Sequence, residues 1–158
     1  MEKMKVFLKD LILLIRPHQW IKNFLVIAPP FFGGIVFSTK ENFLAAFYAF
    51  LSFSLISSTG YLINDLLDLE NDKNHPNKKN RPLPSGRFKT SYIYFIIPIL
   101  FLSSVLISLN LNKTFLIITL IYLAVSILYS LKLKNVVLLD AVCISVGFVF
   151  RIMAVSYT

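Results

Sequence analysis

The sequence has few charged residues, one cysteine and two histidines. Charged residues make up 15% of its 158 residues, against about 25% in an ordinary soluble domain, whereas 56% of the residues are hydrophobic. A soluble domain of this size could not cover so much apolar surface with so few polar residues. The lone Cys143 excludes an intramolecular disulfide and a cysteine-rich metal site, and His18 and His75 are too few to predict a transition-metal site. Lipid is therefore the expected solvent.

Long apolar stretches predict about five membrane-spanning helices. Four stretches without Asp, Glu, Lys, Arg or His approach the length that crosses a bilayer, and they cover residues 23–39, 42–64, 90–112 and 114–131. A fifth, 135–158, is interrupted only by Asp140 and Arg151. A backbone in lipid must satisfy its own hydrogen bonds, and no alternating pattern of barrel strands is present. We therefore expect an all-α fold, a polytopic transmembrane helix bundle.

The amino-terminal part of the chain is less regular. Proline and glycine pairs should kink or break the first stretch into two half-helices, at Pro29, Pro30, Gly33 and Gly34. Before it, residues 2–16 predict an N-terminal interfacial helix, with Trp20 at headgroup depth. Its expected lipid-facing side chains are Phe7, Leu8, Leu11, Leu14 and Ile15. A signal peptide is disfavoured, because the apolar run is short and no small-residue cleavage site follows it.

Basic residues are unevenly distributed among the predicted loops. Most of them precede the first stretch or lie in the 64–90 loop and in 132–134, whereas the opposite side receives only Lys40 and Lys113. By the positive-inside rule, the N-terminus and the 64–90 loop are cytoplasmic in a multi-pass protein of the cytoplasmic (inner) membrane. The net charge of +8 thus reflects topology and phosphate-bearing partners, and we expect no nucleic-acid partner.

The densest polar chemistry follows the second stretch, in residues 64–72. At about 100° per residue, Asp65, Asp68 and Asp72 fall within an arc of roughly 60° on one helix face, and Glu70 projects to the other side. Three carboxylates at the C-terminal end of a helix repel one another and oppose the helix dipole, so an offsetting cation is expected. Oxygen ligands that leave positions for substrate phosphates are typical of Mg²⁺. The alternative is a solvated helix end.

A basic loop, 73–87, adjoins these acidic residues. Together the two segments predict a diphosphate site, in which Mg²⁺ bridges phosphate oxygens to the aspartates. Lysine and arginine would neutralise the remaining charge through charge-assisted hydrogen bonds. The alternative for the loop alone is ordinary cytoplasmic topology charge.

At this point the sequence resembles the UbiA superfamily of intramembrane prenyltransferases. That family's N-D-x-x-D-x-x-x-D motif, at the cytoplasmic end of its second helix, is matched by Asn64, Asp65, Asp68 and Asp72. Its downstream R-P-[LI]-x-S-G element is matched by Arg81, Pro82, Leu83, Ser85 and Gly86. Its Tyr-Ser pair with following basic residues, between spans four and five, is matched by Tyr129, Ser130, Lys132 and Lys134.

Within the superfamily, residues 16–23, 138–140 and 147–151 resemble the decaprenyl-phosphate phosphoribosyltransferase branch. The resemblance implies Mg²⁺-dependent transfer of 5-phosphoribose from phosphoribosyl diphosphate to a polyprenyl phosphate in the membrane lipid. It implies metal ligation and catalysis by Asp65, Asp68 and Asp72, with Asn64 supporting them. It implies substrate binding by Lys22, Lys78, Arg81, Tyr129, Lys134 and Asp140.

Two other functions fit the same residues. A UbiA-type prenyltransferase would move a polyprenyl group from its diphosphate to an aromatic acceptor with the same aspartates. A non-catalytic membrane protein or transporter fragment would use intramembrane acids for coupling ions. Members of the superfamily are about twice as long, with nine helices and a second aspartate-rich motif. We therefore expect 1–158 to be a single membrane domain equivalent to the amino-terminal half, with a carboxy-terminal half as a partner in activity.

Overall fold

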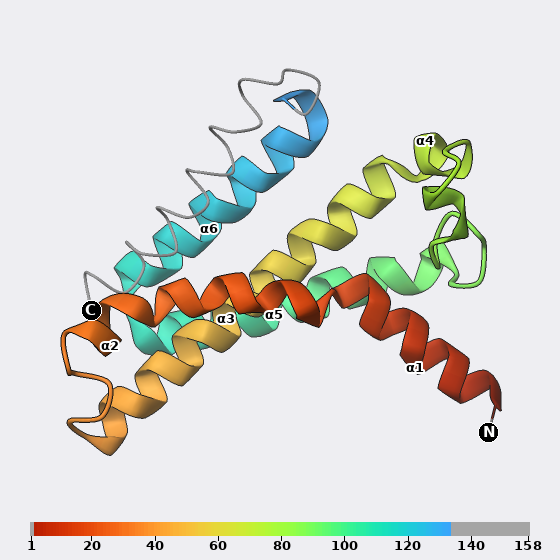
Figure 1. Ribbon diagram of the computed structural model, residues 1–158. Coiled ribbons are helices and arrows are strands. Elements are labelled where there is room, and N and C mark those ends of the chain that lie inside the picture. The colour runs from red at the N-terminus through yellow and green to blue at the C-terminus, as the bar shows by residue number, and fades with distance from the viewer. Residues whose placement is uncertain (1, 134–158) are drawn as a thin grey trace.

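The computed structural model describes residues 2–133, and this part of the chain is helical (Figure 1). The all-α prediction is therefore confirmed there. In chain order the elements are α1 (Glu2–Ile15), the 3₁₀ helix η1 (Pro17–Val26), α2 (Ala28–Phe32), α3 (Lys40–Leu67), α4 (Leu69–Lys73), the 3₁₀ turn η2 (Lys78–Asn80), α5 (Thr90–Leu111), α6 (Lys113–Leu128) and the π-helix η3 (Tyr129–Leu133).

Within residues 2–133, three helices are long and apolar enough to cross a membrane. They are α3, α5 and the continuous segment of α6 and η3, with bounds Lys40–Leu67, Thr90–Leu111 and Lys113–Leu131. These helices confirm the predicted spans over 42–64, 90–112 and 114–131. The predicted span over 135–158 lies outside the described residues.

The first apolar stretch, 23–39, does not form one helix long enough to cross a membrane. Its first residues belong to η1, which begins at Pro17, and its middle forms only the short helix α2. Pro29 and Pro30 lie in the first turn of α2, where a missing backbone N–H is tolerated. After α2 the chain turns through Gly34, whose φ of 70° favours glycine. The proline and glycine pairs therefore break the segment, as their positions predicted.

The amino-terminal helix α1 diverges from the spanning helices, and Figure 1 shows the chain bending where η1 begins. Its residues 2–9 are exposed, as an interfacial helix requires, but its predicted lipid-facing surface is partly wrong. Leu14 is buried against Leu83 and Phe88 of the 74–89 loop, and the Phe7 ring stacks on Phe88 at 5.0 Å. One side of α1 therefore covers protein rather than lipid.

The helix α3 is central to the fold and contacts η1, α5 and α6. Its contact with α5 is polar: the Ser52 hydroxyl lies 3.0 Å from that of Ser104 and 2.7 Å from that of Ser108. Its contact with α6 is close at Gly60, where an added Cβ would lie 3.0 Å from the Ser126 Oγ. Small residues of this kind let membrane helices approach and form hydrogen bonds across their interface.

Two hydrogen bonds attach η1 to the same helix. The Trp20 indole N–H donates to the Ser58 hydroxyl at 2.9 Å, and the Asn23 amide donates to the Ser54 hydroxyl at 3.2 Å. The Ser58 hydroxyl in turn donates to the carbonyl of Ile15, the last residue of α1. These bonds hold the junction between α1 and η1 against the middle of α3, at Ser54 and Ser58, which precede Asp65 along that helix.

The close approach at Gly60 generates a stability prediction. Gly60→Leu should separate α3 from α6 and lower the free energy of unfolding by about 1–3 kcal/mol, as overpacking does in other tightly packed contacts. The measurement is thermal unfolding of the purified protein in detergent. Ala124→Leu, on the exposed face of α6, is the matched control and should leave the melting temperature nearly unchanged. Equal melting temperatures for the two variants would contradict this packing.

Candidate active site

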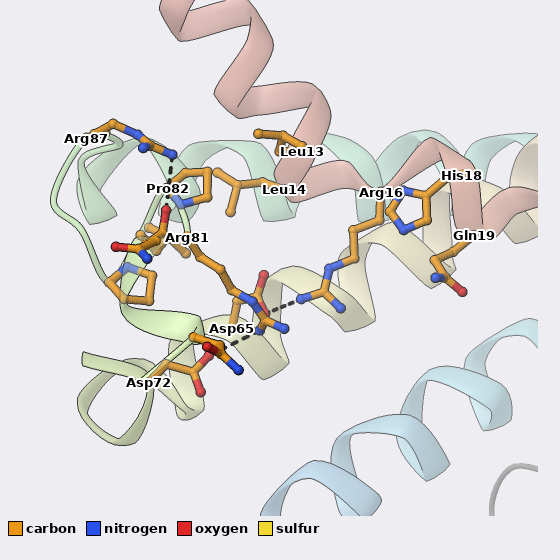
Figure 2. A pocket seen from close by; sticks show the side chains of 14 residues that line it. Leu13, Leu14, Arg16, His18, Gln19, Asp65, Asp72, Arg81, Pro82 and Arg87 are labelled. Atoms are coloured by element: carbon orange, nitrogen blue, oxygen red, sulfur yellow. Dashed lines mark hydrogen bonds and ion pairs between the residues drawn. The ribbon is translucent and has the colours of Figure 1, made fainter. Parts of the chain in front are cut away.

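A cavity of about 500 Å³ lies at the C-terminal end of α3, beside the 74–89 loop (Figure 2). Three parts of the chain supply its polar lining: the α1–η1 junction, the end of α3 with α4, and the loop. The polar lining residues are Arg16, His18, Gln19, Asp65, Asp72, Asn77, Asn80, Arg81 and Arg87. Polar side chains from distant parts of the sequence thus converge on one concave site, which is typical of a ligand-binding pocket.

The two aspartates of the cavity come from either side of a break in the helix. Asp65 lies in the last turn of α3, Asp68 caps that helix, and Asp72 lies in α4. Backbone bonds continue across the break, because the Asp68 N–H donates to the Asn64 carbonyl and the Asp72 N–H to the Asp68 carbonyl. Asp65 and Asp72 therefore keep a common side, and both carboxylates are buried.

Cationic side chains surround these carboxylates. An Arg16 guanidinium nitrogen donates to Asp65 Oδ1, as Figure 2 shows. Arg81 Nη1 lies 3.2 Å from Asp72 Oδ2 and 3.9 Å from Asp65 Oδ1. Lys78 Nζ lies 3.3 Å from Asp72 Oδ1. Both aspartates are thus paired, as buried carboxylates must be, and a single guanidinium group lies between them.

Arg16 reaches Asp65 because of an unusual backbone conformation. Its φ of 56° and ψ of 56° are left-handed, and it is the only non-glycine residue with a positive φ within 2–133. A bulky side chain is rare in this region and is retained where the surroundings enforce it, often at functional sites. The Arg16 guanidinium also stacks over the Tyr61 ring at 5.2 Å. The turn ends α1 and aims a cation at the end of α3.

The loop that carries Arg81 and Arg87 is held by its own apolar residues. Leu83 and Phe88 are buried in a cluster with Leu14 of α1, Leu62 of α3 and Ile93 of α5. Gly86 makes the turn between them, with a φ of 76°. Burying these side chains fixes the loop against three helices, so the exposed arginines project from an ordered support.

The structure brings together four of the residues proposed from the sequence, Asp65, Asp72, Lys78 and Arg81. Asp68 and Asn64 adjoin the site at the helix break, but neither lines the cavity. Lys22 is exposed on η1, and Tyr129 begins η3, both also outside the lining. Lys134 and Asp140 lie outside the described residues. The roles of all these residues remain predictions.

Sequence reasoning missed several lining residues. The sequence singles out neither Arg16 and Gln19 within the family-like segment 16–23 nor Arg87 within the basic loop 73–87. Their spacing from Asp65 along the chain gives no signal that they meet, because a left-handed turn at a non-glycine residue has no sequence signature. The Arg-Pro pair at 16–17 was the available hint, since the residue before proline avoids the ordinary helical conformation.

The donor set fits a divalent cation only in part. Among residues 2–133, no group of three or more His, Cys, Asp or Glu side chains is placed to hold a metal ion. Asp65 and Asp72 nevertheless flank one position, which the Arg81 guanidinium shares with them. One or two carboxylates together with substrate phosphates are the usual ligands of Mg²⁺. The two aspartates therefore fit a Mg²⁺ ion that arrives with a phosphate-bearing ligand.

Comparison with known proteins identifies the family of this fold. Residues 27–158 match the model of the UbiA prenyltransferase family. The decaprenyl-phosphate phosphoribosyltransferase of Mycolicibacterium smegmatis is 36% identical over 153 residues, which are 95% of this chain and 48% of that protein. The chain thus spans about half the length of this curated relative.

Two solved structures share the arrangement of helices. One, from work on digeranylgeranylglyceryl phosphate synthase, is 26% identical with a TM-score of 0.74, over 98% of this chain and 52% of the other. The second, a UbiA homologue from Archaeoglobus fulgidus bound to GPP and Mg²⁺, is 22% identical with a TM-score of 0.75, over 93% of this chain and 53% of the other; it shows the shared fold. Since the family model also covers well over half of its residues, the chain belongs to the UbiA prenyltransferase family.

Proposed function

We propose that this chain forms the phosphoribosyl diphosphate site of a membrane transferase that moves 5-phosphoribose to a polyprenyl phosphate and releases diphosphate. One observation carries the proposal: Asp65 and Asp72 flank a cation position in a cavity lined by three arginines, at the end of a membrane-spanning helix. The identity to a decaprenyl-phosphate phosphoribosyltransferase supports this donor and acceptor.

The charge of the cavity suits a polyanion. Arg16, Arg81 and Arg87 line it against two carboxylates. Guanidinium groups bind phosphate oxygens with paired hydrogen bonds, which gives both charge neutralisation and orientation. The three guanidinium groups have more N–H donors than the two aspartates accept. Donors would therefore remain for the oxygens of a diphosphate in the cavity.

Ligand binding would redistribute the ion pairs. Arg16 and Arg81 would turn from the aspartates to phosphate oxygens, and Asp65 and Asp72 would become free to hold Mg²⁺. Bound Mg²⁺ would supply positive charge to the diphosphate leaving group. In this proposal Lys78 adds a further cation, and Asp68 and Asn64 support the metal ligands from the helix break.

The proposed reaction needs little acid or base chemistry from the chain. A polyprenyl phosphate is already an anionic nucleophile, so its oxygen can attack the anomeric carbon as the bond to diphosphate breaks. The protein must hold two anionic substrates together and screen their repulsion, which is positioning and electrostatic stabilisation. We assign these tasks to the arginines of the cavity, with Lys22, Tyr129, Lys134 and Asp140 as further candidate substrate contacts.

A second function is prenyl transfer from a polyprenyl diphosphate to an aromatic acceptor. Membership of the UbiA prenyltransferase family supports transfer of a prenyl group, and the same aspartates and arginines would bind the diphosphate of that donor. In either case we propose that the cavity opens to the cytoplasm in the inner membrane. We also propose that a carboxy-terminal half completes the acceptor side.

The ion-pair exchange predicts opposite effects of one substitution with and without metal. In the presence of Mg²⁺, Asp65→Asn or Asp72→Asn should weaken binding of inorganic diphosphate by at least about tenfold, because a metal ligand is lost. With a chelator present, the same variants should bind at least as tightly as wild type, because an arginine is freed. Isothermal titration calorimetry of the chain in detergent measures both affinities.

The matched control for these variants is Glu70→Gln. Glu70 is an exposed acid near Asp68 and Asp72 that pairs with Lys73, so its substitution should leave both affinities unchanged. An unchanged affinity of both aspartate variants in Mg²⁺ would contradict the proposed metal site.

A donor assay separates the two transferase functions. Membranes that contain the whole gene product should label a polyprenyl phosphate when given labelled phosphoribosyl diphosphate, because we expect the cavity to orient a phosphorylated sugar. The same membranes should give no product with prenyl diphosphate and hydroxybenzoate. Membranes with the Asp65→Asn variant supply the background. Product from the second pair alone would reverse the choice between the two functions.

A further inference from the structure

Asp10 is a buried acid on a helix that is otherwise largely exposed. The residues before it in α1 are exposed, whereas Asp10 itself is 4% exposed. One of its oxygens, Oδ1, lies 3.5 Å from Arg87 Nη2. The other, Oδ2, is buried and has no hydrogen-bond partner in the part of the chain that the structure describes. Asp10 is thus an ionisable group in a place where an apolar residue would pack without this cost.

Burial of a carboxylate with an unsatisfied oxygen opposes folding. Such a group loses hydration that one long ion pair replaces only in part. Leu14 lies one helical turn later on the same face of α1 and is also buried, in an apolar cluster. An apolar residue of this kind would suit position 10 as well. The presence of an aspartate here therefore needs an explanation, and a functional role is one that applies to buried polar groups of this kind.

The partner of Asp10 faces the candidate active site. Arg87 lines the cavity, and Figure 2 shows its guanidinium group beside the loop, apart from Arg16 and His18. The same Nη2 atom donates to the backbone carbonyl of Asn80 at 3.3 Å. The Arg87 side chain is 49% exposed. It therefore has two acceptors on its protein side and an open side toward the cavity.

We propose that Asp10 is a positioning residue that holds the Arg87 guanidinium group at the cavity rim for a phosphate-bearing ligand. This inference rests on the proposed function of the cavity. A free arginine on a loop samples many rotamers, and the loss of that freedom on binding weakens affinity. The buried charge of Asp10 limits those rotamers before the ligand arrives.

The packing of α1 makes Asp10 a firm anchor. The Phe7 ring lies against the rings of Phe88 and Tyr92, at 5.0 and 5.6 Å between centroids. These contacts bind α1 to the segment that follows Arg87, so helix and loop form one unit. The interfacial helix thereby contributes to the site twice, with Asp10 through Arg87 and with Arg16 at its end.

A double-mutant cycle tests the proposal with the whole chain in detergent. The probe is inorganic diphosphate with Mg²⁺, measured by titration calorimetry. Asp10→Asn, which keeps the shape of the side chain, should weaken binding by about three- to tenfold, the effect that corresponds to the net contribution of one ordinary hydrogen bond. Arg87→Gln should weaken it at least as much, and the double variant no more than Arg87→Gln alone.

The control on the same helix is Glu2→Gln, an exposed position that should bind diphosphate as wild type does. If Asp10 had only a structural role, Asp10→Asn would lower the melting temperature, and its loss of affinity would add in full to that of Arg87→Gln in the double variant. That result would overturn the proposal. Wild-type affinity in Arg87→Gln, a safe change at a half-exposed residue, also overturns it, even if Asp10→Asn does not fold. Absence of diphosphate binding by wild type would overturn the proposed function and this inference together.

Discussion

The site depends on ion pairs between two buried carboxylates and the cationic side chains around them. Asp65 and Asp72 are withdrawn from water at the end of a long apolar helix, and an unpaired charge there would strongly destabilise the fold. Cations must therefore reach them, and Arg16, Lys78 and Arg81 do. These cations come from the α1–η1 junction and from the 74–89 loop. Their ion pairs therefore hold both segments against the end of α3 and against α4.

Much of the fold was predictable, because lipid imposes a simple rule on sequence. The spans α3, α5 and α6 follow from apolar stretches whose length matches a bilayer. The first stretch, 23–39, is apolar enough for lipid, but apolar composition alone does not determine where a helix ends. Proline pairs and a glycine turn divide that segment, and hydrogen bonds from Trp20 and Asn23 hold its first part as η1 against α3.

The site was predictable only where local spacing determines it. Helical periodicity places Asp65 and Asp72 on one side, and their convergence on Arg81 agrees with that spacing. The contributions of Arg16 and Asp10 depend on a left-handed turn and on tertiary packing of α1, which no short-range pattern encodes. Asp68 shows the limit of the helical-wheel argument: α3 ends at Leu67, and Asp68, at the break, does not line the cavity although its spacing places it on the same face as Asp65 and Asp72.

The two sides of these ion pairs differ in their exposure to solvent. The carboxylates of Asp65 and Asp72 are buried at 8% and 6% exposure, whereas the Arg81 side chain is 42% exposed. Short aspartate side chains on helices have few rotamers, and long arginine side chains on a loop have many. When a polyanion competes for the cations and Mg²⁺ takes their place at the carboxylates, the Arg81 side chain can turn outward while the carboxylates stay in place. In the proposed function, the aspartates would thus be neutralised by arginine and lysine before the substrate arrives, and would already be positioned to hold Mg²⁺ when phosphate oxygens take up Arg81.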